Sequence, residues 1–359
     1  MMGIIDKYII RKFLGTFFYA LALMVLVAVI FDASEKMDDF IEKKAPLKAI
    51  LVDYYLNFIP YFANLFSPMF VFIAVIYFTS RMASHTEIVA ILNGGMSFNR
   101  MMRPYFISAA FLAGLTFYLN GWVIPHANKS RLEFEYSYIR NPFTLKERNI
   151  HRQTSPGTLI YMESYNAREN MGFRFSLEKI KNGKRVYFLS SDRIRWDSTS
   201  SKWVIENYFV RTINGMEEHT ERGLRKDTVL DFEPKDFRIR GSTIEAMDNF
   251  ALNTFIDEQR FQGSSNIDAY LVEKYRRFSF PFATFILTGI GVSLASRKVR
   301  GGIGLHLGMG ILLSFAYIVF MQIGTTYAAK GEFPAILAVW IPNFIFAAVA
   351  YYLFRRAPK

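Results

Sequence analysis

A polar segment between two apolar runs is the best candidate for binding chemistry in this chain. Ser84-His-Thr-Glu87 has the spacing of a capping box, in which Ser84 accepts from the backbone N–H of Glu87 and the Glu87 carboxylate reaches back to the cap. A short helix of about residues 84–95 is therefore predicted. Its apolar face would carry Ile88, Ile91 and Leu92, and Gly94-Gly95 would end it.

Two roles for this apolar face remain open. It could dock into a groove of a soluble partner, as amphipathic helices often do. It could equally lie against the membrane surface or against its own helix bundle.

Catalytic motifs are absent from the rest of the sequence. There is no phosphate-binding G-x-x-x-x-G-K-[ST] pattern, so the chain is not expected to hydrolyse ATP by that route. The five histidines, at positions 85, 126, 151, 219 and 306, form no H-E-x-x-H pair, and no metal or nucleophilic site is visible. We expect a protein that is not an enzyme and binds no cofactor of its own.

The elements that must position the polar segment are six apolar runs without Asp, Glu, Lys or Arg. They cover residues 13–31, 54–80, 104–125, 278–296, 301–329 and 333–354. Each is about long enough for a helix that crosses a bilayer, which needs roughly 20 apolar residues. Because backbone groups in lipid must be satisfied internally, the runs predict transmembrane helices in a three-plus-three arrangement.

The basic residues set the orientation. One side of the membrane collects Lys7, Arg11, Lys12, Arg81, Arg100, Arg103, Arg297, Lys298, Arg300, Arg355, Arg356 and Lys359. Both termini are therefore predicted to be cytoplasmic and the long central stretch extracytoplasmic. This topology explains most of the net charge of +12, so nucleic-acid binding is not expected.

The central stretch predicts an antiparallel β domain. Runs with period-two alternation cover residues 158–163, 173–180, 186–196, 203–213 and 228–232. Turn signals at Asn182-Gly183, Asp197–Ser201 and Asn214-Gly215 separate them. We expect a small sandwich or jelly roll without disulfides, because the chain has no cysteine.

The predicted fold class is thus membrane α-helical with an inserted, jelly-roll-like antiparallel β domain. The predicted divisions are a first transmembrane half (1–130), the β domain (131–250), a connector (251–277) and a second transmembrane half (278–359).

At the polar segment the chain resembles the LptF/LptG family, the paired permeases of the lipopolysaccharide-exporting ABC transporter. The matching residues are Glu87-Ile88, Gly95-Met96-Ser97, Asp6-Lys7-Tyr8-Ile9 and Trp122-Val-Ile-Pro125. Family members usually have Ala where this chain has Asn93. The glycine-rich entry at 301–310 and the ending at Lys359 look more like LptG than LptF.

The resemblance implies a permease subunit of the bacterial inner membrane. Its implied partners are a cytoplasmic ABC ATPase dimer similar to LptB, a second permease similar to LptF, and a periplasmic bridge similar to LptC and LptA. ATP would be used by the ATPase, with Glu87 facing a basic group there. The implied coupling residues are Glu87, Ile88, Ile91, Leu92 and Gly95.

Cations on the outward side would then meet the phosphates of lipopolysaccharide. Arg gives bidentate phosphate contacts and Lys acts as a point charge. The candidate residues are Lys36, Lys43, Lys44, Arg131, Lys274, Arg276 and Arg277, with Lys36, Lys44, Arg131 and Arg277 preferred. The plain alternative for each is a solvated or snorkelling side chain.

Two other functions stay open on the sequence alone. An ion-coupled secondary transporter would act without an ATPase, and the charge-free apolar runs count against it. A membrane scaffold could recruit partners through the β domain.

Overall fold

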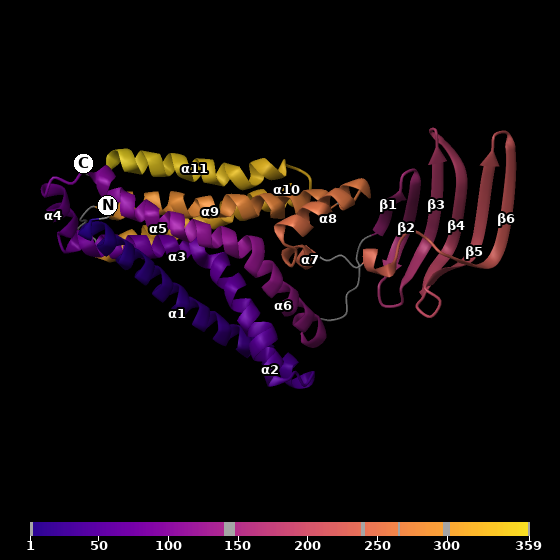
Figure 1. Cartoon of the computed structure of the whole chain (residues 1–359), viewed down its shortest axis with the longest axis horizontal. Helices are drawn as coiled ribbons and strands as arrows, with labels where there is room; N and C mark the ends of the chain where they lie inside the picture. The colour runs from indigo at the N-terminus through magenta and orange to yellow at the C-terminus, as the bar shows by residue number, and fades with distance from the viewer. Residues whose placement is uncertain (1–2, 140–147, 238–240, 265, 297–301, 358–359) are drawn as a thin grey trace. The chain divides into compact units, whose positions relative to one another are not determined.

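A computed structural model describes residues 3–139, 148–237, 241–264, 266–296 and 302–357 (Figure 1). Five residues used above, namely Arg297, Lys298, Arg300, Gly301 and Lys359, lie outside these ranges. The chain forms two compact units. One consists of Met1–Ile139, Ile244–Leu252 and Asp268–Lys359, and the other of Arg140–Thr243 and Asn253–Ile267.

The first unit is helical and contains six helices long and apolar enough to cross a membrane. The first half comprises α1 (Ile4–Glu42), then α2 (Leu47–Ala49) with η1 (Ile50–Tyr55) and α3 (Leu56–Ser84), then α5 (Phe98–Tyr118) with η2 (Leu119–Val123) and α6 (Ile124–Tyr138). The second half comprises α9 (Ile267–Ala295), α10 (Gly302–Ala329) and α11 (Ala335–Arg356). The predicted membrane helical fold is confirmed.

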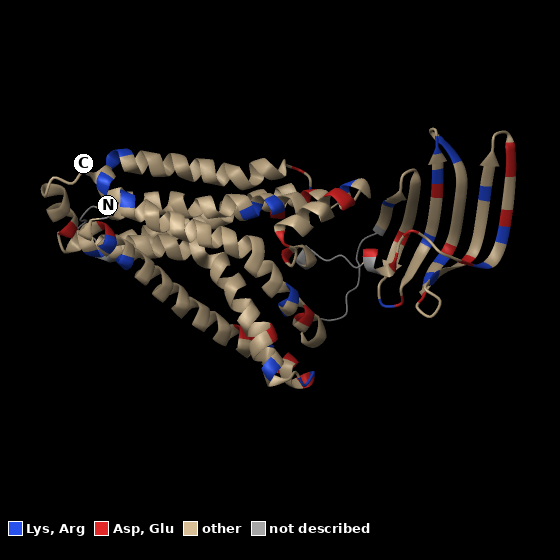
Figure 2. Ribbon diagram, viewed as in Figure 1, with Lys and Arg blue, Asp and Glu red and all other residues tan. Residues whose placement is uncertain are grey.

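Several of these helices are longer than a bilayer requires. The 39 residues of α1 span about 58 Å at 1.5 Å per residue, against a hydrocarbon core of about 30 Å. In Figure 2, charged residues gather towards the helix ends, and the middle of most helices is free of them. The ends of the longer helices can therefore project from the lipid.

Aromatic packing fixes the first three helices to each other. Phe13 of α1 lies 5.8 Å from Phe78 of α3 between ring centroids, and Phe78 stacks on Tyr105 of α5 at 5.3 Å. All three are nearly or fully buried, and the Tyr105 hydroxyl lies 3.1 Å from Thr79 Oγ1. The segment between α3 and α5 is therefore held on a rigid base.

The second unit contains one six-stranded antiparallel sheet. Its strands are β1 (Arg148–Ser155), β2 (Thr158–Asn166), β3 (Met171–Lys181), β4 (Lys184–Asp197), β5 (Lys202–Asn214) and β6 (Glu217–Thr228). They pair in the order β1-β2-β3-β4-β5-β6, so each described strand pairs with its neighbours in the chain. The antiparallel β domain is confirmed, but its connections are those of a meander, because short turns join every pair, and differ from the Greek-key connections of a jelly roll.

The predicted turns at Asn182-Gly183, Asp197–Ser201 and Asn214-Gly215 lie between these strands. The predicted strand over 228–232 is wrong. That segment leaves the sheet after β6 and returns Phe232 to the buried Trp203, whose Nε1 donates to the Phe232 carbonyl at 2.9 Å. The chain continues through η3 (Pro234–Phe237), α7 (Gly241–Glu245) and α8 (Asn249–Phe261).

Candidate functional site

The short helix α4 (Glu87–Asn93) occupies the predicted polar segment, at the end of the bundle that holds both termini (Figure 1). The predicted capping box is wrong. Helix α3 continues through Ser84, whose hydroxyl donates to the Arg81 carbonyl at 2.8 Å. The cap position is Thr86, in a left-handed conformation with φ of 60° and no side-chain cap. A tight turn, rather than a side chain, therefore starts α4.

The predicted end of α4 is confirmed. Gly94 follows the last helical residue, and Gly95 has φ of +87°, which a side chain at Cβ would disfavour. Its N–H donates to the Leu92 carbonyl at 3.1 Å.

The apolar face of α4 packs on its own bundle, which decides between the two roles left open above. Ile88 is 1% exposed and lies in one cluster with Phe98 and Met101 of α5. Ile91 and Leu92 pack against the same cluster. Ile88 is therefore buried within the chain, whereas the family resemblance had implied that it contacts a partner. The exposed positions of α4 are Val89, Ala90 and Asn93.

Glu87 links this helix to the first membrane helix. Tyr8 of α1 donates its hydroxyl to Glu87 Oε2 at 3.0 Å, and His85 Nδ1 lies 4.0 Å from Oε1. The Glu87 side chain stays 36% exposed, so a charged group from outside the chain can reach it.

A second polar contact fixes the start of α1 beside α4. The guanidinium of Arg100 on α5 donates to both Asp6 oxygens, at 2.7 and 2.6 Å. Bidentate pairs of this kind are directional and among the stronger ion pairs. Sequence reasoning noted Asp6 only as part of a motif, because its partner lies 94 residues away.

At the other end of the helical unit, two of the predicted phosphate-binding arginines are buried in internal ion pairs. Arg131 of α6 is 8% exposed and donates to Glu135 at 3.0 Å, with Glu245 at 3.8 Å. Its guanidinium also lies over the Tyr61 ring at 4.6 Å. This geometry favours a role in tying α6, α3 and the segment around residue 245 together.

Arg277 of α9 is enclosed in the same way. It is 5% exposed and donates to Glu273 at 3.1 Å, to the Met247 carbonyl at 2.7 Å and to the Ile244 carbonyl at 3.0 Å. Its neighbour Arg276 also donates to Glu273, at 2.6 Å, but its side chain remains 41% exposed. Of these two arginines, Arg276 is thus the one open to a ligand.

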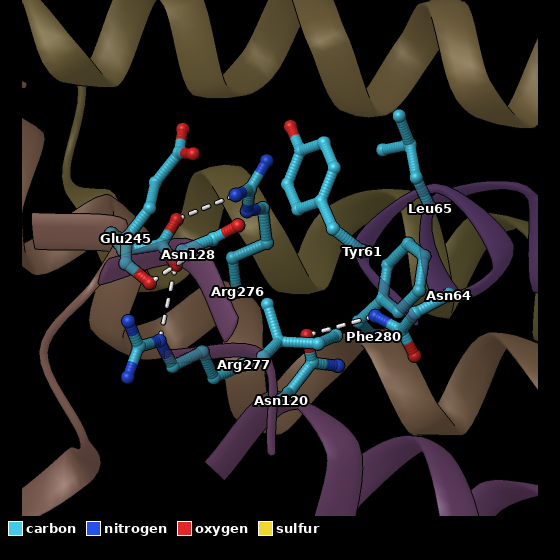
Figure 3. Close-up of a pocket in the computed structure, with 11 residues that line it drawn as sticks. Tyr61, Asn64, Leu65, Asn120, Asn128, Glu245, Arg276, Arg277 and Phe280 are labelled. Carbon is cyan, nitrogen blue, oxygen red and sulfur yellow. Dashed lines mark hydrogen bonds and ion pairs between the residues drawn. The ribbon is translucent and has the colours of Figure 1, made fainter. Parts of the chain in front are cut away.

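A cavity of about 60 Å³ lies between these groups (Figure 3). Asn64 of α3 donates to Asn120 of η2 at 2.9 Å on its wall. The other amide atoms, Asn64 Oδ1 and Asn120 Nδ2, are buried without a partner among the described residues. A cavity of this size with such lining has room for a few water molecules that would satisfy them.

The four predicted lysines differ in their surroundings. Lys36 of α1 forms an ion pair with Asp32 at 2.5 Å and contacts the Tyr54 hydroxyl. Lys43 and Lys44 are exposed just beyond the end of α1, while Lys274 is half-buried on α9. The lysines at the end of α1 and Arg276 are therefore the more accessible cations.

The acidic partners in this region were missed from the sequence. Arg131 with Glu135 and Glu273 with Arg277 both have i,i+4 spacing, a signal that a search for helical ion pairs would have found. Glu245 carried no such signal, because it comes from a separate segment of the chain.

Comparison with known proteins identifies the family. The family model described as lipopolysaccharide export system permease LptF/LptG matches residues 7–356. No curated protein sequence matches the chain. The match covers both apolar halves, α4 and the β domain in the order that the structure shows. The chain belongs to the LptF/LptG family of lipopolysaccharide export permeases and is a multi-pass inner-membrane protein.

Proposed function

We propose that the chain is the LptG-like subunit of an exporter that extracts lipopolysaccharide from the inner membrane and passes it to a periplasmic bridge. Its partners would be a cytoplasmic ABC ATPase dimer, an LptF-like permease and LptC/LptA-like bridge proteins. ATP would be used only by the ATPase. Both termini would be cytoplasmic, and the β domain, whose strands lie between Arg148 and Thr228, would be periplasmic.

The observation that carries this proposal is the geometry of α4. Its apolar face is buried against α5, which leaves Glu87, Val89 and Asn93 facing outwards at the end of the bundle. A seven-residue helix anchored on one face and exposed on the other is suited to transmit a push from a partner. The ATPase would thus contact Glu87 and Val89, while Ile88, Ile91, Leu92 and Gly95 hold the helix in place.

For the lipid, accessible cations are better candidates than buried ones. Lys43, Lys44, Lys274 and Arg276 would contact phosphate, with Lys36 held nearby by Asp32. Arg131 and Arg277 would support the site through the ion pairs described above.

The test is to isolate the tagged chain gently from its native membrane and identify the proteins and lipids that accompany it. An ATPase, a second permease and lipopolysaccharide are expected together. Val89→Asp should reduce recovery of the ATPase, because Val89 is 51% exposed on α4. Asn99→Asp, an exposed site on α5, is the matched control and should leave recovery unchanged. Normal recovery with Val89→Asp would contradict docking through α4.

A further inference from the structure

We propose that Tyr8 is a positioning residue that orients the Glu87 carboxylate and makes α1 move with α4. This inference rests on the proposed coupling role of Glu87 and adds to it the element that receives the movement. The contact joins residues 79 positions apart in the chain, and neither the helical spacing nor the apolar pattern of the sequence requires it.

The first step of the argument is the use of the two Glu87 oxygens. Tyr8 donates to Oε2 at 3.0 Å, whereas Oε1 lies 4.0 Å from Nδ1 of the His85 ring. A carboxylate can accept several hydrogen bonds, so the Tyr8 bond leaves Oε1 available to a basic group of a partner. Tyr8 therefore limits the rotation of the Glu87 side chain and leaves its second oxygen accessible to a partner.

The second step is the attachment of Tyr8 to its own helix. Asp6, two residues earlier, is 4% exposed and held by Arg100, and Ile9 is fully buried in the cluster that also contains Ile88. The first turns of α1 are thus fixed by an ion pair and by packing on either side of Tyr8. A displacement of α4 reaches α1 both through the shared apolar cluster and through the Tyr8–Glu87 bond.

The third step separates these two routes. The apolar cluster resists compression but has no preferred direction, whereas a hydrogen bond to a charged group is directional. Loss of the Tyr8 hydroxyl should leave the helices packed and weaken only the directional link. Because the apolar packing is retained, the change should be measurable but smaller than loss of Glu87 itself.

The experiment uses the complete transporter in lipid vesicles and measures lipopolysaccharide molecules released per ATP hydrolysed. Tyr8→Phe should lower this ratio about three- to tenfold, with unchanged recovery of the ATPase and an unchanged melting temperature. Tyr19→Phe removes the same hydroxyl from a 70% exposed site on α1 and is the matched control.

Different outcomes identify which claim fails. If Glu87→Gln leaves release per ATP unchanged, the proposed coupling role is wrong. If Glu87→Gln lowers the ratio and Tyr8→Phe does not, only the role of Tyr8 is wrong. A double variant Tyr8→Phe/Glu87→Ala should be no worse than Glu87→Ala, because Ala has no acceptor for the Tyr8 hydroxyl and both changes remove the same hydrogen bond; additive losses would show independent effects and overturn the inference. Should Tyr8→Phe also lower the melting temperature, a ratio equal to that of Tyr19→Phe when both are compared at equal stability would overturn the inference as well.

Discussion

Arg277 donates to the Glu273 carboxylate at 3.1 Å while the same guanidinium holds the carbonyls of Ile244 and Met247. One buried side chain thereby fixes the segment around residues 244–247 to α9. Burying a charge is costly unless it is paired and hydrogen-bonded, and here every partner comes from the chain itself. This arrangement explains why a cation at this end of the helical unit need not be a ligand site.

Replacing Arg277 should therefore destabilise the protein. Arg277→Ala leaves the Glu273 charge with one partner fewer and frees two buried carbonyls, which predicts a loss of about 3–5 kcal/mol. Thermal unfolding of the full chain in detergent measures it.

Arg276→Ala is the control for this loss, because it removes a partner of the same carboxylate from a side chain that is 41% exposed. Its cost should be clearly smaller, since surface pairs contribute about 0–1 kcal/mol. Equal costs for the two variants would mean that burial does not distinguish the two arginines.

The paired amides beside the cavity make a second prediction. Asn64→Leu leaves the Asn120 amide buried without its partner, at a cost of about 1–3 kcal/mol. Asn64→Leu/Asn120→Leu removes both polar groups and should recover most of that stability. Unfolding of Asn64→Leu, Asn120→Leu and the double variant measures the coupling between the two amides. If the costs of the two single variants simply add up in the double variant, the two side chains do not stabilise the protein through a shared hydrogen bond.

The apolar helices could be predicted from the sequence because lipid demands long uncharged runs, whatever the neighbours are. The strand β6 could not. Its residues Glu217–Thr228 are mostly charged and exposed, so no alternating apolar pattern marks them, and pairing with β5 alone makes the strand. The apolar Leu230 and Phe232 gave a false strand signal, because they pack on the core from a segment outside the sheet.

The candidate site shows the same limit. The exposed carboxylate of Glu87 and the end of α4 follow from local spacing. The prediction that Ser84 caps α4 is wrong because Ser84 is still part of α3. The sequence predicts Arg131 and Arg277 as ligand contacts from their expected side of the membrane and from the bidentate contacts that Arg makes with phosphate. Their burial depends on Glu245 and on carbonyls from a distant segment, which no local pattern reports.

Two glycines in turns between strands of the six-stranded sheet allow a third prediction, in which one variant is the control for the other. Gly157 and Gly183 both have positive φ, of +76° and +73°. A Cβ at Gly183 would meet open space, so Gly183→Ala should cost only about 1–2 kcal/mol for the left-handed conformation. A Cβ at Gly157 would lie 2.5 Å from the Ile180 carbonyl oxygen, which adds an overpacking cost of about 1–3 kcal/mol.

Unfolding of the two variants under the same conditions tests the difference. Gly157→Ala should melt at the lower temperature, because the Gly157 carbonyl also accepts from Ile180 N–H at 2.7 Å and cannot easily move away. Equal melting temperatures would show that this turn relaxes without cost.

The last prediction concerns pH. Asp197, the last residue of β4, accepts from the Ser200 hydroxyl at 2.8 Å and from the Thr199 N–H at 3.0 Å in the turn that leads to β5. These hydrogen bonds, that from the Ser200 side chain first, hold the pKa of the Asp197 carboxyl below its ordinary value of 3.8. A group whose pKa is lower in the folded state stabilises above the unfolded pKa, and this stabilisation is lost as pH falls through the folded pKa.

Asp197→Asn should therefore unfold at a lower temperature than the parent chain at pH 7, and the gap should narrow as the pH is lowered below about 4. Ser200→Ala removes the hydrogen bond that lowers the Asp197 pKa most. The difference in melting temperature between this variant and the parent chain should therefore also shrink as the pH falls below about 4. Melting curves from pH 7 to pH 3, followed by tryptophan fluorescence, measure both, since Trp203 is buried in the same unit. A constant difference between Asp197→Asn and the parent over this range would show that the turn, and not the charge of Asp197, sets the stability here.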